Sequence, residues 1–166
     1  MGSFRFNRGV IFGWISIFSE GLIMFSKILL TINHNNIIEF QLPNDWVFEE
    51  NDESLAIYNP SGEGAITISF YSLLQSNSDT CEQISVMAKK YANQNRIKLD
   101  KPLVVYHSSQ EKTILYGTGH TNDNWFIKFW MIAQHPRAIH ASYLCRKKSR
   151  EIKSCDSIIE SIRFIS

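Results

Sequence analysis

The chain has 166 residues, a length that is typical of one domain built around one hydrophobic core. Apolar residues make up 44% of it and aromatic residues 13%, so a core can form without a structural metal or a disulfide framework. Seventeen basic residues nearly balance sixteen acidic ones. This balance argues against a broad electrostatic surface for nucleic acid or for an anionic membrane, and we expect any recognition by charge to be local.

The cysteines indicate neither a disulfide framework nor a zinc site. Cys81, Cys145 and Cys155 are odd in number and have no CxxC spacing. We interpret them as reduced, mostly buried thiols. Isoleucine is about twice as common as leucine and asparagine is abundant, which indicates an AT-rich genome and favours a bacterial origin.

The amino-terminal segment resembles an export signal in part, because basic residues at 5–8 precede an apolar stretch. Glu20 interrupts that stretch, and the run before it is shorter than the ~20 residues of a spanning helix. No small-x-small cleavage site follows. We therefore predict a hydrophobic extension at 1–23 and a single domain at 24–166 in the cytoplasm. The alternative is attachment to the membrane, or export, through residues 9–25.

The domain itself begins with strand patterns. A polar stretch at 33–36 separates the first two, which predicts a β-hairpin. Asn-Pro-Ser-Gly at 59–62 ends the fourth, and strict alternation of apolar and polar residues marks the fifth. The predicted strands of this half are 28–32, 37–42, 46–49, 55–58 and 65–73.

A helical period follows and then returns near the carboxyl end. Cys81, Ile84, Ala88 and Ala92 recur at helical spacing and predict a helix over 80–95. Strands are predicted at 103–107, 113–120, 125–133 and 138–145. A last amphipathic helix then carries Ile152, Cys155, Ile158, Ile159 and Ile162 on one face. The fold class expected from these elements is α+β, with an antiparallel β-sheet flanked by two α-helices.

Three short motifs, in this order, resemble the PsbP-like superfamily. They are Phe-Gln-Leu-Pro-Asn-Asp-Trp at 40–46, Tyr-Asn-Pro at 58–60 followed by Gly-Ala-Ile-Thr-Ile-Ser at 64–69, and Ile-Glu-Ser-Ile-Arg-Phe at 159–164. That group includes DcrB-type proteins, Mog-type Ran-binding proteins and Eag chaperones of type VI secretion. The resemblance implies an α/β/α sandwich that binds protein partners and has no catalytic residues.

The residues themselves indicate no enzyme, cofactor or metal site. The five histidines are scattered, although His120 and His140 would approach each other if they lay on neighbouring strands. Cys81 sits where a helix amino terminus lowers a thiol pKa, but it also begins the apolar stripe of its helix, and packing is the simpler interpretation. The glycines Gly117 and Gly119 lack the third glycine and the following helix of a dinucleotide loop. They fit better as relief of crowding opposite Trp125 or Trp130, or as positions that permit a bend.

Two charged segments are candidate contact sites. The acidic loop, with Glu49, Glu50, Asp52 and Glu53, suits a basic partner, as an inhibitor of a nucleic-acid-cleaving toxin requires. The simpler alternative is a solvated loop. A basic cluster suits phosphate or an acidic protein, or is ordinary soluble surface. Its members are Arg146, Lys147, Lys148, Arg150 and Lys153.

The strand at 125–133 is apolar on both faces. Each face must be covered or bind something, and two helices suffice to cover both. If one face stays open, Phe126, Lys128 and Trp130 are the best anchors, because large aromatics dominate interface energies. The leading hypothesis is a non-enzymatic protein-binding domain, either a toxin-neutralising immunity protein or a secretion chaperone or adaptor, with a toxin or secreted effector as partner. The alternative is an envelope-associated structural domain tethered by its amino-terminal segment.

Overall fold

The computed structural model describes residues 29–50, 54–73, 79–107 and 112–165. The expected extension at 1–23, and with it the boundary of the domain, lies outside them. None of the helices within these ranges is long and apolar enough to cross a membrane. The elements in chain order are β1 (Leu29–His34), β2 (Ile38–Pro43), β3 (Val47–Glu50), β4 (Ser54–Tyr58), β5 (Gly64–Ser72), α1 (Thr80–Gln94), β6 (Lys98–Leu99), β7 (Val104–His107), β8 (Thr113–His120), β9 (Phe126–Gln134), β10 (Arg137–Cys145), α2 (Ile152–Ser161) and β11 (Arg163–Phe164).

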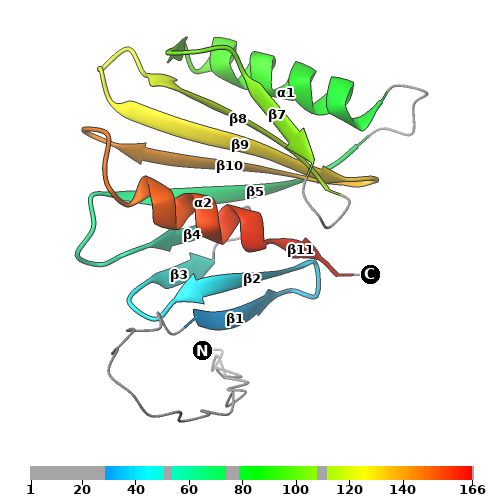
Figure 1. The fold of residues 1–166 in the computed structure, drawn as a ribbon, viewed down its shortest axis with the longest axis vertical. Helices are drawn as coiled ribbons and strands as arrows, with labels where there is room; N and C mark the ends of the chain where they lie inside the picture. Colours follow the sequence, from blue (N-terminus) through cyan, green and yellow to red (C-terminus); the bar gives the residue numbers. More distant parts are fainter. Residues whose placement is uncertain (1–28, 51–53, 74–78, 108–111, 166) are drawn as a thin grey trace, which may run out of the picture.

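The larger of two antiparallel sheets has the strand order β3-β4-β5-β10-β9-β8-β6, and β7 also pairs with β8 (Figure 1). The meander β8–β9–β10 is local in sequence. The pairing of β10 with β5 then joins it to the first half of the chain, with Ala141 opposite Ile68. The turn between β9 and β10 sets Gln134 opposite Arg137, which places Leu144 opposite Ile127.

The predicted hairpin is present, but it forms a second sheet, in the order β1-β2-β11. Asn35 and Asn36 in its turn have positive φ angles, a conformation that asparagine tolerates better than most residues. The chain leaves β2 through a turn in which the Trp46 N–H donates to the Pro43 carbonyl. Because the apolar side of β2 is buried in the same core as the larger sheet, the small sheet acts as part of a covering layer.

The two helices lie on opposite faces of the larger sheet (Figure 1). α1 contacts β8 and β9, and its Ile84, Ala88 and Ala92 pack on Phe129 and Met131. α2 contacts β10 and β2, and its Cys155, Ile158 and Ile159 enter the other core. The predicted α+β class, an antiparallel sheet flanked by two helices, is confirmed.

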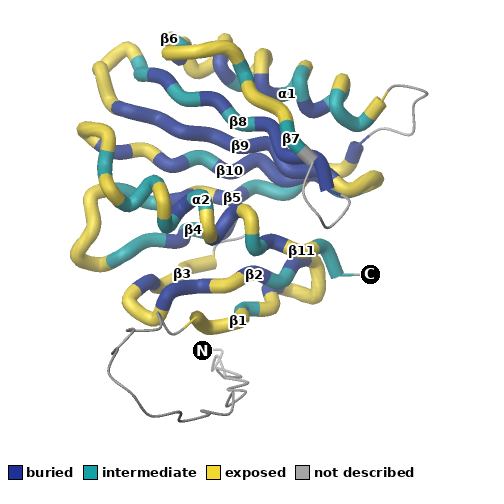
Figure 2. Tube along the Cα trace, viewed as in Figure 1, coloured by how far each residue is buried: buried dark blue, intermediate teal, exposed yellow. Residues whose placement is uncertain are grey.

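The covering layers are staggered. On β9 every residue but the last is buried, so both faces of this strand are covered, as the dark tube in Figure 2 shows. On β4, by contrast, burial alternates: Leu55 and Ile57 are buried, while Ser54, Ala56 and Tyr58 are partly exposed. β5 alternates in the same way around Ile66 and Ile68. No described element therefore covers the α1 side of the sheet over β5, β4 and β3.

Candidate functional site

The residues expected as anchors on the two-faced strand lie beneath α2. Phe126, Lys128 and Trp130 are 2%, 8% and 1% exposed. Their expected role depended on a face left open, and this face of β9 is covered. A part in partner binding stays a prediction for these three residues, and it would require α2 to move.

Lys128 and Trp130 instead hold α2 in place. The Lys128 ammonium donates to Asp156 Oδ1 at 2.6 Å, and Trp130 Nε1 donates to the same oxygen at 3.2 Å. The ammonium also lies 4.7 Å from the centre of the Tyr116 ring, a cation–π distance. The apolar strand accommodates a lysine because a carboxylate and an aromatic face compensate for its charge.

The acidic candidates occupy the edge of the larger sheet. Glu49 and Glu50 are exposed on β3, whereas Asp52 and Glu53 lie outside the described residues. The Tyr58 hydroxyl donates to Glu49 Oε1 at 2.5 Å, and His34 Nδ1 lies 2.8 Å from Glu50 Oε1. Successive strand residues point to opposite faces, so these two carboxylates do not form one acidic surface. Their part in partner binding stays a prediction.

The histidine and cysteine candidates are separated or buried. His120 lies on the α2 side of β8 and His140 on the α1 side of β10, so the two rings are on opposite faces of the sheet. Burial lowers the pKa of His140 to about 4 and raises the pKa of the Cys145 and Cys155 thiols. Cys81 is half-buried in the first turn of α1. No group of histidine, cysteine or acidic side chains suited to a metal ion occurs within the described ranges.

The uncovered part of the α1 side forms a continuous surface, which we call the open sheet face. The register aligns Leu144, Ala65, Tyr58 and Val47 across β10, β5, β4 and β3. This row continues from the buried Ile127 of β9. The outward side chains of the open sheet face are Val47, Glu49, Ala56, Tyr58, Ala65, Thr67, Ser69, Tyr71, Ser142 and Leu144.

Large apolar side chains are exposed where this surface meets the loops. Leu144 is 40% exposed and Trp125 is 38% exposed. Trp125 directly precedes β9, and alternation from Ile127 puts it on the same side of the sheet as Leu144. The Arg146 guanidinium carbon lies 5.7 Å from the centre of the Trp125 ring. An exposed tryptophan beside an arginine is the combination that protein interfaces favour.

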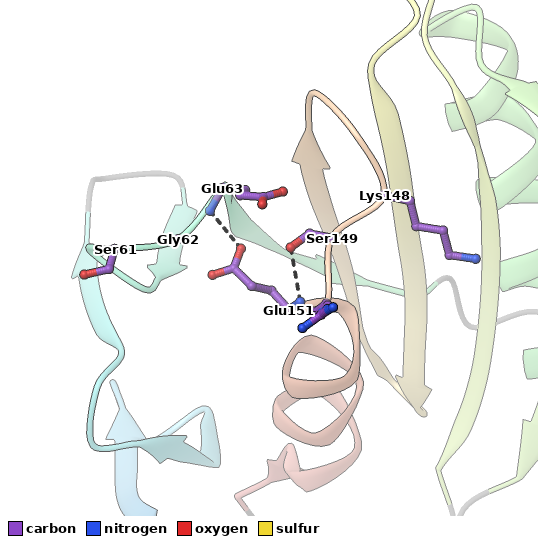
Figure 3. A pocket seen from close by; sticks show the side chains of 7 residues that line it. Ser61, Gly62, Glu63, Lys148, Ser149 and Glu151 are labelled. Atoms are coloured by element: carbon purple, nitrogen blue, oxygen red, sulfur yellow. Dashed lines mark hydrogen bonds between the residues drawn. The ribbon is translucent and has the colours of Figure 1, made fainter.

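A polar pocket adjoins this patch, between the β4–β5 turn and the start of α2. Glu151 crosses it: its Oε2 accepts from the Glu63 N–H at 2.9 Å and from the Tyr143 hydroxyl at 2.6 Å. Figure 3 shows the Glu151 carboxylate reaching toward Glu63 and the Ser149 hydroxyl beside the Glu151 backbone. A Cβ at Gly62 would lie 2.0 Å from Glu151 Oε1, so a larger residue at this position would require the Glu151 side chain to shift. The pocket is lined by Ser61, Gly62, Glu63, Lys148, Ser149, Arg150 and Glu151.

Part of the exposed basic cluster borders the same pocket: Lys148 and Arg150 are among its lining residues, and the Lys148 side chain points away from Glu63 and Glu151 in Figure 3. Arg146, Lys147, Lys148 and Arg150 are all exposed, and we call them the basic rim. None of the ion pairs formed among the described residues involves any of the four. The nearby Glu151 carboxylate accepts hydrogen bonds from two uncharged donors and keeps its negative charge, so it offsets one of the four positive charges of the rim.

Sequence reasoning did not single out Trp125 and Leu144 as surface residues. Their apolar types are typical of a core, and their shared neighbourhood depends on the register between β9 and β10. The two-residue turn at His135 and Pro136 sets that register. This register also determines which side chains are exposed at the ends of both strands. Of the features of this site, only the basic cluster could be recognised from consecutive residues of the sequence.

Comparisons with solved structures cover most of this chain. Cyanobacterial PsbP from Synechocystis superposes with a TM-score of 0.60 at 11% identity, over 88% of this chain and 98% of that one. The Ran-binding protein Mog1p of Saccharomyces cerevisiae gives a TM-score of 0.56 at 9% identity, over 85% and 97%. A variant of protein Mog1 gives 0.55 at 7% identity, over 84% and 97%. No family model and no curated protein sequence matches this chain. At these identities the comparisons concern the fold, and the predicted PsbP-like fold is confirmed.

Proposed function

We propose that this chain, which has the PsbP-like fold, is a non-enzymatic protein-binding domain that contacts its partner through the open sheet face. The observation that carries the proposal is the exposure of Trp125 and Leu144 at the end of that face. Clustered apolar side chains on a domain surface mark sites of interaction, and tryptophan contributes strongly to such interfaces.

The titratable groups with shifted pKa values support a structural role for the interior. Lys112 is 1% exposed and donates to the carbonyls of Glu160 and Ile162 at the end of α2. His140 is packed against Tyr91, with 4.0 Å between the ring centres. Tyr143 donates to Glu151. Each of these groups is used to join elements of the fold, which is consistent with a protein that acts by contact.

Two biological roles are compatible with such a domain, and different surfaces favour them. A secretion chaperone or adaptor fits the apolar row of the open sheet face, which suits an exposed apolar segment of an effector. A toxin-neutralising immunity protein fits the acidic edge at Glu49 and Glu50, which suits a basic nuclease. We favour the chaperone or adaptor because both of those carboxylates already accept hydrogen bonds within the domain.

Co-purification tests the proposal. The full chain, tagged after Ser166, is expressed in its native host and purified under gentle conditions beside Trp125→Ala and Val86→Ala. Val86 is also exposed, but it lies on α1, away from the open sheet face. We expect a stoichiometric protein partner with the wild type and with Val86→Ala, and its loss with Trp125→Ala. Failure to recover such a partner, or equal recovery with all three proteins, contradicts the proposal.

The envelope-associated domain remains the second proposal, and it depends on residues 9–25, outside the described ranges. Fractionation of native cells separates it from the first. Protein in the membrane fraction that moves to the soluble fraction when residues 1–23 are deleted supports a tether. Soluble full-length protein contradicts it.

A further inference from the structure

We propose that the partner presents an acidic segment, in which large apolar side chains are flanked by aspartate or glutamate, to Trp125, Leu144 and the basic rim. This inference rests on the proposed function, since it names the chemistry of the partner that the open sheet face receives.

The apolar part of the site is small and well placed. Leu144 pairs with Ala65, and Ala65 pairs with Tyr58, so a large side chain is followed by a small one along the row. The small Ala65 side chain leaves room beside Leu144 for an apolar group of the partner. From β10 to β3 the row crosses three strand spacings, or about 14 Å, a length suited to a short segment rather than to a second domain.

Arg146 joins this apolar part to the positive charge. Its guanidinium group lies near the Trp125 ring, and a planar guanidinium on an aromatic face keeps its N–H groups directed outward at the edges. Those groups match a carboxylate in a paired geometry. Arg146 is exposed and forms no ion pair with any residue in the described ranges.

The local charge balance favours an anionic partner. Four of the five residues at 146–150 are cationic. The carboxylates beside them are Glu63 and Glu151 in the pocket, and Asp123 lies two residues before Trp125 in the chain. The donors to Glu151 are uncharged, so its negative charge counts with those of Glu63 and Asp123. Three carboxylates thus oppose the four cations of the rim, and the balance is positive.

The arrangement of Glu49 and Glu50 at the acidic edge argues against a basic partner. A basic partner would need carboxylates that act together, yet Glu49 and Glu50 face opposite sides of β3. Each also has a hydrogen-bond partner, Tyr58 for Glu49 and His34 for Glu50. The basic rim is therefore the larger group of like charges beside exposed apolar side chains.

A displayed library of random 12-residue peptides provides the probe. The full chain is used for selection, and the recovered peptides are synthesised and titrated against purified protein. We expect enrichment of aspartate and glutamate together with leucine, phenylalanine or tryptophan. Recovery of basic or neutral peptides, or no enrichment, would overturn the inference.

Matched charge reversals locate the binding site. Arg146→Glu combined with Lys148→Glu should lower the affinity for the selected peptides at least about tenfold. Trp125→Ala should lower this affinity by a similar factor. Lys89→Glu combined with Lys90→Glu makes the same charge change on exposed positions of α1 and should leave the affinity unchanged. Circular dichroism and thermal unfolding show whether each variant folds. Equal affinity for both double variants, when both are folded, contradicts the inference.

Two further arms test other anions that a basic surface attracts. A single-stranded RNA of 20 nucleotides and vesicles with anionic lipid are titrated under the same conditions. If either one binds more tightly than the selected peptides and loses this binding in the Arg146→Glu and Lys148→Glu variant, the partner of this surface is a nucleic acid or a membrane. In that case the acidic segment is excluded. If Trp125→Ala abolishes co-purification of a native partner while the charge reversal does not, the proposed function stands and this inference fails.

Discussion

The Lys128 ammonium lies 2.6 Å from Asp156 Oδ1, and this ion pair connects the centre of the larger sheet to α2. The same oxygen accepts a hydrogen bond from Trp130 Nε1. Two residues expected to bind a partner thus bind a helix of their own chain. The cover over this face of β9 is therefore held by a charge-assisted hydrogen bond as well as by apolar packing.

Replacing Lys128 by methionine should weaken this connection. The substitution keeps most of the side-chain volume but leaves Asp156 with only the tryptophan hydrogen bond. We expect the free energy of unfolding to fall by about 1–3 kcal/mol, because Asp156 is partly exposed and regains some water. Urea denaturation measures it, with Lys89→Met on the exposed side of α1 as the control. Affinity for a partner should be unchanged, and a folded Lys128→Met protein that no longer binds would make Lys128 a contact residue.

Lys112 provides a second internal connection. Its ammonium donates to the carbonyls of Glu160 and Ile162 at the end of α2, where backbone acceptors lack partners within the helix. Lys112→Met leaves these carbonyls unsatisfied and should cost about 1–3 kcal/mol. Amide hydrogen exchange should then accelerate first in α2. Exchange in α2 that stays at the wild-type rate would show that this lysine does not hold the end of the helix, and Lys147→Met, an exposed position, is the matched control.

His140 should make stability depend on pH. Burial lowers its pKa from 6.5 to about 4, so between these values the unfolded chain binds a proton that the folded chain does not. The contribution of His140 is complete above pH 6.5 and is lost as the pH falls toward 4, by about 3 kcal/mol in total.

The substitution His140→Phe isolates this effect. It keeps a ring against Tyr91 and removes the titrating group, so its free energy of unfolding should fall less between pH 6.5 and 4 than that of the wild type. Urea denaturation at a series of pH values gives both curves. His135→Asn, at an exposed position, should follow the wild type. Parallel curves for His140→Phe and the wild type would contradict the assignment.

The periodic elements were predictable from the sequence because each signal is local. Helical spacing of Ile84, Ala88 and Ala92 predicted α1, and the apolar residues on both faces of β9 indicated that each face is either covered or binds a partner. The order of short motifs predicted the fold. These signals depend only on which side chains are buried, and burial follows hydrophobicity.

The division into two sheets and the candidate site were not predictable in the same way. β11 has two residues, too few for a pattern, and its pairing with Ile38 joins distant parts of the chain. Lys112 follows polar residues, which is typical of an exposed position, yet it is buried by the helix end that it caps. The neighbourhood of Trp125 and Arg146 depends on a register that one turn determines, and a one-residue shift would have put their side chains on opposite faces.

Amide hydrogen exchange of the domain, alone and with its co-purified partner, tests the central claim most directly. If the domain acts by contact through the open sheet face, the partner should slow exchange in 59–67 and 142–150, from the β4–β5 turn to the basic rim. Exchange in α1 should be unchanged. Protection confined to α1 or to β7, with 59–67 and 142–150 exchanging as in the free domain, would contradict the account.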